Sequence, residues 1–126
     1  MTHLLDISTL LAAIWQTHSA HDKVDAWLEG KSIAVCPLSE LGFLRISTQL
    51  KGPFRAPMRD ARELLSDFTN KTRCSFIAAD LPGLKSEAKN SDTVTDCYLA
   101  ELAARHGMKL ATLDTRIPHK AVEVIG

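Results

Sequence analysis

Short apolar segments alternate with longer amphipathic segments along this chain, and this alternation restricts its possible folds more than any other feature. Apolar runs separated by helical patterns predict βαβ units and a mostly parallel sheet with helices on both faces. We therefore expect an α/β fold, a three-layer α/β/α sandwich, although periodicity does not fix the strand order. The predicted strands are residues 3–6, 33–36, 74–79, 109–113 and 122–125, and the predicted helices are residues 10–28, 39–50, 58–70 and 93–106.

Length and composition predict one globular domain over residues 1–126. Hydrophobic residues make up 45% of the chain and charged residues 24%, as in ordinary folded proteins. No apolar run approaches the ~20 residues that a membrane helix needs. Asp6 interrupts the apolar N-terminal segment, which also lacks a basic start, so we expect no signal peptide and a cytoplasmic protein.

The charges balance overall, but they are unevenly distributed. Fifteen basic and fifteen acidic residues argue against binding of nucleic acid by bulk electrostatics. Residues 45–73 nevertheless hold seven basic and three acidic residues, a net charge of +4, so the remainder carries −4. This segment is either a solvated helix face or a phosphate-binding face, for which Arg45, Arg59 and Arg62 are the candidates.

Four acidic residues stand where strands end or helices begin. Asp6 closes the first strand and Asp114 closes the strand LATL, while Glu40 follows the second strand and Asp96 opens a helix. Ligands of open α/β sheets bind outside the carboxyl ends of the strands. Each acid alone is explained as a helix cap. Four carboxylates at one edge, however, repel one another unless a cation neutralises them.

A hard divalent cation is the ligand that such a cluster favours. Mg²⁺ and Mn²⁺ take oxygen ligands, and they suit phosphodiester hydrolysis because they polarise the phosphate and lower the pKa of water. The three cysteines lack the spacing of a zinc site, and we expect buried, reduced thiols.

Several segments resemble PIN-domain nucleases, and most closely the VapC-type toxins of bacterial toxin–antitoxin pairs. The opening LLDISTLL contains Asp6 and Ser8, and SELGFLRIST contains Glu40. The segment TDCYLAELAARHGMKLATLD contains Asp96 and Asp114 and is the most specific of the three. The resemblance extends over essentially the whole chain.

This resemblance implies a Mg²⁺-dependent endoribonuclease, in which Mn²⁺ can substitute. Asp6, Asp96 and Asp114 would bind the metal, and Glu40 would hold a metal-bound water or help to deprotonate the nucleophile. The resemblance also implies that hydroxyl groups orient the carboxylates, that the chain forms a homodimer, and that a cognate antitoxin covers the site. The residues implied to orient the carboxylates are Ser8 and Thr112.

Other interpretations remain open from the sequence alone. A non-catalytic PIN-fold module that binds RNA or protein is one alternative, which the complete set of four acids disfavours. A phosphatase of haloacid-dehalogenase type needs a second Asp two residues after the first, where this chain has Ser8. A phospho-receiver domain that is phosphorylated on Asp6 or Asp80 would need a pair of acids before that aspartate, and this chain lacks such a pair at its start. The pair His18 and His21 fits a solvated or RNA-adjacent helix face better than a zinc site, and Asp92 is a helix-entry cap or a peripheral ligand.

Overall fold

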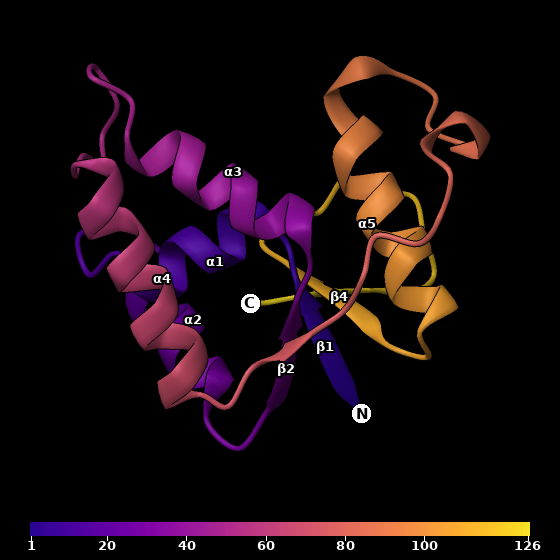
Figure 1. Ribbon diagram of the computed structural model, residues 1–126. Coiled ribbons are helices and arrows are strands. Elements are labelled where there is room, and N and C mark those ends of the chain that lie inside the picture. The colour runs from indigo at the N-terminus through magenta and orange to yellow at the C-terminus, as the bar shows by residue number, and fades with distance from the viewer.

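The computed structural model describes residues 1–126 and contains one five-stranded sheet with the order β3-β2-β1-β4-β5 (Figure 1). All four strand pairs are parallel. The central strand β1 pairs Leu4 with Ala34 of β2 and with Leu110 of β4. The strands are β1 (Thr2–Leu5), β2 (Ser32–Val35), β3 (Ser75–Phe76), β4 (Lys109–Thr112) and β5 (Val122–Val124).

Helices cover both faces of this sheet, which confirms the predicted α/β fold. Side chains that alternate along β1 point to opposite faces: Leu4 packs in the core beneath α5, and Leu5 packs in the core beneath α1 to α4. Figure 1 shows the same division, with α5 alone on one side. The helices are α1 (Ile7–Ile14), α2 (His21–Leu28), α3 (Pro37–Ser47), α4 (Met58–Lys71) and α5 (Val94–Arg105), with 3₁₀ turns η1 (Gly83–Lys85) and η2 (Ser91–Thr93).

The prediction of one helix over residues 10–28 was wrong. The chain forms α1 and α2 here, because Trp15 has an extended backbone and a polar turn follows it. His18 lies in that turn, and its ring stacks on Phe54. His21 begins α2, and its Nδ1 lies 2.7 Å from the carbonyl oxygen of Ala12. The two histidines therefore do not share one helix face.

The third strand is shorter than the predicted residues 74–79. Only Ser75 and Phe76 pair with β2, opposite Ala34 and Val35. The N–H of Ile77 makes a last 2.9 Å hydrogen bond to the carbonyl oxygen of Val35, and the next residue of the partner, Cys36, is already the N-cap of α3. The segment that follows β3 therefore leaves the sheet and continues toward α5 (Figure 1).

Close contact between α1 and α3 brings their first turns together at the carboxyl edge of the sheet. A Cβ atom at Gly42 would lie 2.3 Å from Cδ1 of Ile7, so only glycine permits this approach. Ser39 adds a second link, since its hydroxyl donates a 2.9 Å hydrogen bond to the carbonyl oxygen of Leu5. The residue after β1 is consequently held beside the beginning of α3.

Two further features concern the helices and the cysteines. None of the helices is both long enough and apolar enough to span a membrane. All three cysteines are free; Cys36 and Cys97 are buried, while Cys74 is partly buried.

Candidate active site

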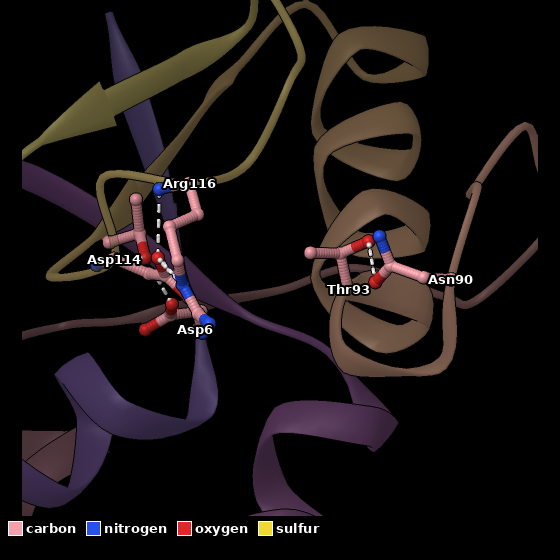
Figure 2. Close-up of polar contacts among 6 residues, drawn as sticks. Asp6, Asn90, Thr93, Asp114 and Arg116 are labelled. Carbon is pink, nitrogen blue, oxygen red and sulfur yellow. Dashed lines mark hydrogen bonds and ion pairs between the residues drawn. The ribbon is translucent and has the colours of Figure 1, made fainter.

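Asp6 is the buried centre of the carboxyl edge, where β1 passes into α1. It is 2% exposed and is the N-cap of α1, with Oδ1 accepting a 2.8 Å hydrogen bond from the backbone N–H of Thr9. Its other oxygen, Oδ2, accepts a 2.5 Å hydrogen bond from the hydroxyl of Thr112 (Figure 2). Because both oxygens are held, the orientation of this carboxylate is fixed.

Thr112, the last residue of β4, connects Asp6 to Asp114 two residues later. The hydroxyl of Thr112 accepts a 3.0 Å hydrogen bond from the backbone N–H of Asp114, and its single proton goes to Asp6. Thr9 supports the same junction from α1, since its hydroxyl donates to the carbonyl oxygen of Ala111 at 3.1 Å. The neighbouring ends of β1 and β4 thus place the two aspartates in one hydrogen-bonded network.

The charge of Asp6 is stabilised by neutral donors alone. Burial raises the pKa of this carboxyl group, whereas the hydrogen bonds from Thr112 and Thr9 lower it, and the net shift is upward. A buried carboxylate without a cationic partner is costly. Asp6 is therefore a strong electrostatic attractor for a cation.

Asp96 faces the same edge from the first turn of α5. The pKa of this half-buried carboxyl group is raised to about 6. Burial is the largest cause of the increase, and the negative charges of Asp6 and Asp114 add to it. Arg116 acts in the opposite direction. The structure thus brings together three of the four predicted carboxylates, from β1, α5 and the end of β4.

The beginning of α5 is tied to the loop before it. Thr93, the N-cap residue of α5, donates a 3.3 Å hydrogen bond from its hydroxyl to Oδ1 of Asn90 (Figure 2). This contact lies three residues before Asp96 and helps to fix the first turn of the helix.

Asp114 has a partner that the sequence did not predict. The Arg116 guanidinium donates from Nε to Oδ1 and from Nη2 to Oδ2 of Asp114, each at 3.0 Å (Figure 2). The backbone N–H of Arg116 adds a 2.8 Å bond to Oδ1. These hydrogen bonds hold the pKa of Asp114 below its usual range. A basic residue two positions after the strand-end acid was the available sequence signal.

Glu40 lies apart from this trio in its interactions. It occupies the first turn of α3, where burial raises the pKa of its carboxyl group. Burial, and then the charge of Glu40, raises the pKa of the Cys74 thiol to about 11. Glu40 is not among the charges that shift the pKa values of the three aspartates.

The remaining predicted residues are exposed. Ser8 lies in the first turn of α1 and makes no hydrogen bond to Asp6, which is bonded by Thr9 instead. Arg45 lies in the last turn of α3. Arg59 and Arg62 project from α4, and Arg59 is 92% exposed with a loose 3.7 Å contact to Asp60.

The three aspartates supply only hard oxygen donors, the ligands that Mg²⁺ and Mn²⁺ prefer. No three carboxylate, imidazole or thiol side chains are already arranged as a metal-binding group. Binding of one cation by all three aspartates therefore requires side-chain rotation. Asp6 is held by its hydrogen bonds to neutral donors, whereas Asp114 is bonded by an exposed guanidinium.

Comparison with known families decides the family of this chain. Residues 3–123 match the sequence model of the PIN domain. The chain belongs to the PIN domain family. This PIN domain is 32% identical over 121 residues to "Ribonuclease VapC38" of Mycobacterium tuberculosis, covering 90% of this chain and 86% of the relative. It is 30% identical over 132 residues to "Ribonuclease VapC39" of the same organism, with coverage of 96% and 94%.

Solved structures share the fold. The crystal structure of VapBC2 from Rickettsia felis bound to a promoter DNA fragment aligns with a TM-score of 0.63 at 14% identity, over 98% of this chain and 97% of the other. The structure of FitAB bound to IR36 DNA aligns with a TM-score of 0.64 at 19% identity, over 98% and 93%. At these identities the likeness concerns the fold of the PIN domain.

The raised pKa of Asp96 predicts a pH-dependent cost in the metal-free protein. The folded state binds the proton more tightly than the unfolded state, so stability falls as pH rises from about 4 through about 6. In EDTA at pH 7.5, Asp96→Asn should raise the free energy of unfolding by about 1 kcal/mol, a value discounted for solvent screening. At pH 4 the gain should disappear.

Urea unfolding of both proteins at the two pH values measures this difference. Asp80→Asn is the matched control, since His106 and Arg105 lower the pKa of Asp80 and its replacement should not stabilise the protein at pH 7.5. Equal stability of wild type and Asp96→Asn at pH 7.5 would contradict the raised pKa of Asp96.

Proposed function

We propose that this PIN domain is a metal-dependent endoribonuclease, the toxin of a VapC-type toxin–antitoxin pair. The observation that carries the proposal is the trio of carboxylates whose charges act on one another at the carboxyl edge of the sheet. The similarity to proteins named Ribonuclease VapC over most of the chain supports an RNA substrate.

Asp6, Asp96 and Asp114 are the proposed ligands of Mg²⁺, for which Mn²⁺ can substitute. The donor chemistry fits, and Asp6 in particular is buried and oriented without a cationic partner. Bound Mg²⁺ supplies positive charge that polarises the phosphate, lowers the pKa of water and balances the leaving oxygen. Thr112 and Thr9 keep Asp6 in position throughout.

Glu40 is proposed to hold or deprotonate the attacking water from the first turn of α3. Burial raises the pKa of its carboxyl group, which makes it a stronger base than an exposed glutamate. Ser8, two residues after Asp6, is proposed to orient the carboxylates through water because its side chain is exposed.

RNA requires positive charge outside the acidic edge, since carboxylates repel phosphates. Arg45, Arg59 and Arg62 are the proposed contacts, and all three are exposed on α3 and α4. Guanidinium groups suit this role because their planar fork bonds phosphate oxygens in pairs.

The proposal includes protein partners. We infer a homodimer and a cognate antitoxin, whose basic side chain would be attracted to the acidic edge. The fold neighbour VapBC2 is itself described as a complex bound to promoter DNA. The proposed compartment is the cytoplasm, and free thiols at all three cysteines accord with a reducing environment.

The first prediction is RNA cleavage that depends on Mg²⁺ or Mn²⁺. Purified protein should cleave transfer, ribosomal or messenger RNA in the presence of Mg²⁺ and should be inactive in EDTA. Asp6→Asn and Asp96→Asn should lower the cleavage rate at least about a hundredfold, because each removes a ligand from the proposed metal site. Gel analysis of end-labelled RNA measures the rate.

Asp80→Asn is the control for cleavage, since this carboxylate pairs with Arg105 and His106 away from the trio. Full activity in EDTA, or in either aspartate variant, would contradict metal-dependent catalysis. RNA binding without cleavage would favour a non-catalytic module, and phosphate release from small phosphoesters would favour a phosphatase.

The second prediction concerns the affinity for RNA. In an Asp96→Asn background that prevents cleavage, Arg59→Gln with Arg62→Gln should weaken binding of a single-stranded RNA oligonucleotide. The log–log salt dependence should flatten by about 0.7 for each lost phosphate contact. Fluorescence anisotropy across a salt series measures this slope.

Arg105→Gln is the matched control, because Arg105 ends α5 and pairs with Asp80. An unchanged salt slope in the double variant would assign Arg59 and Arg62 to a solvated helix face and remove them from the RNA site.

A further inference from the structure

Arg116 is the one basic side chain bonded directly to a carboxylate of the trio. Three of its N–H groups point at Asp114: the backbone N–H and Nε share Oδ1, and Nη2 bonds Oδ2. The charge of Arg116 is also felt by Asp92 and Asp96. The guanidinium thus neutralises part of the acidic edge in the protein without metal.

This pairing conflicts with metal binding by Asp114. A carboxylate offers about four lone-pair directions, and three donors from Arg116 already occupy both oxygens. A cation that approaches these oxygens also meets the positive charge of the guanidinium. Asp6 differs, since neutral Thr9 and Thr112 hold it and no cation lies against it. Arg116 and a divalent cation therefore compete for Asp114.

The competition is readily reversible because the ion pair is exposed. The side chain of Arg116 is 67% exposed and that of Asp114 is 22% exposed. Ion pairs at the protein surface typically contribute at most about 1 kcal/mol to stability, and a bidentate pair such as this one lies toward the upper end of that scale. A divalent cation with two further carboxylates, Asp6 and Asp96, interacts more strongly with this edge than one guanidinium can.

The backbone around Arg116 does not depend on the guanidinium. The N–H of Asp114 donates to the hydroxyl of Thr112, a bond that involves neither the guanidinium nor the carboxylate of Asp114. When the guanidinium leaves Asp114, this bond to the strand end keeps the backbone two residues before Arg116 beside the site. A released guanidinium stays within reach of a phosphate that approaches the carboxylates.

We propose that Arg116 is a phosphate-binding residue of the active site, which Asp114 holds in the metal-free protein and a divalent cation releases. This inference rests on the proposed function. Its consequence is a coupling: metal binding neutralises the carboxylates and at the same time exposes a planar cation that bonds phosphate oxygens in pairs. Metal and RNA should then bind cooperatively.

The test compares Mg²⁺ binding to wild type and Arg116→Gln by isothermal titration calorimetry. Removal of the competing charge should tighten Mg²⁺ binding about two- to fivefold, the scale of one exposed ion pair. Arg105→Gln removes a similar exposed pair at the other end of α5 and should leave Mg²⁺ affinity unchanged. Thermal unfolding of each variant checks that it is folded.

The second measurement is the affinity for a single-stranded RNA oligonucleotide in Ca²⁺ and in EDTA, with intact RNA verified on a gel. Arg116→Gln should weaken RNA binding several-fold in Ca²⁺. In EDTA it should have little effect, because the wild-type guanidinium is then bonded to Asp114 and is not available to RNA. Arg116→Lys should give an intermediate loss in Ca²⁺, because its point charge lacks the paired donors.

The outcomes separate this inference from the proposed function. If wild type binds Mg²⁺ and Arg116→Gln binds it equally or more weakly, competition for Asp114 is overturned while the nuclease proposal stands. An equal loss of RNA affinity in Ca²⁺ and EDTA would overturn the release step. If wild type binds neither Mg²⁺ nor RNA, both proposals fall.

Discussion

Burial of the Asp6 carboxylate is the interaction on which the rest of the site depends. The side chain ends β1, caps α1 and receives hydrogen bonds from Thr9 and Thr112. These bonds fix the relation between two neighbouring strands and the first helix. They provide each carboxylate oxygen with a hydrogen bond, but no cation lies against the negative charge. The fold therefore holds an unpaired buried charge at the carboxyl edge of the sheet.

The buried negative charge lowers the stability of the metal-free protein and at the same time favours the proposed binding of a cation. The charges of Asp6 and Asp114 act on Asp96 and contribute to its raised pKa, a cost that the folded chain bears without metal. Arg116 relieves part of this cost from one side. A site that is partly neutralised from within can remain folded in the absence of metal and still attract a divalent cation.

The sequence was sufficient for the fold class and for the positions of the strand-end acids. Apolar strands between helices determine a parallel sheet, and parallel strands carry residues such as Asp6 and Asp114 to a common edge. Asp96 was singled out because it opens a helix, and the structure places it in the first turn of α5.

Other features depend on tertiary contacts that periodicity does not encode. The break between α1 and α2 follows from the extended backbone at Trp15, which packs on Phe54 from a distant loop. The short β3 reflects where its partner strand ends. The pairing of Arg116 with Asp114 and the proximity of Glu40 to Cys74 are matters of side-chain direction, which spacing alone leaves undetermined.

The most direct measurement is anomalous diffraction from crystals of the wild-type protein soaked in Mn²⁺. The account predicts a manganese peak at the carboxyl edge of the sheet, within bonding distance of carboxylate oxygens of Asp6 and Asp96, with the Asp114 carboxylate turned away from Arg116. Manganese bound only elsewhere, or an Asp6 carboxylate without a metal at saturating Mn²⁺, would contradict the claim that this buried carboxylate organises a cation site.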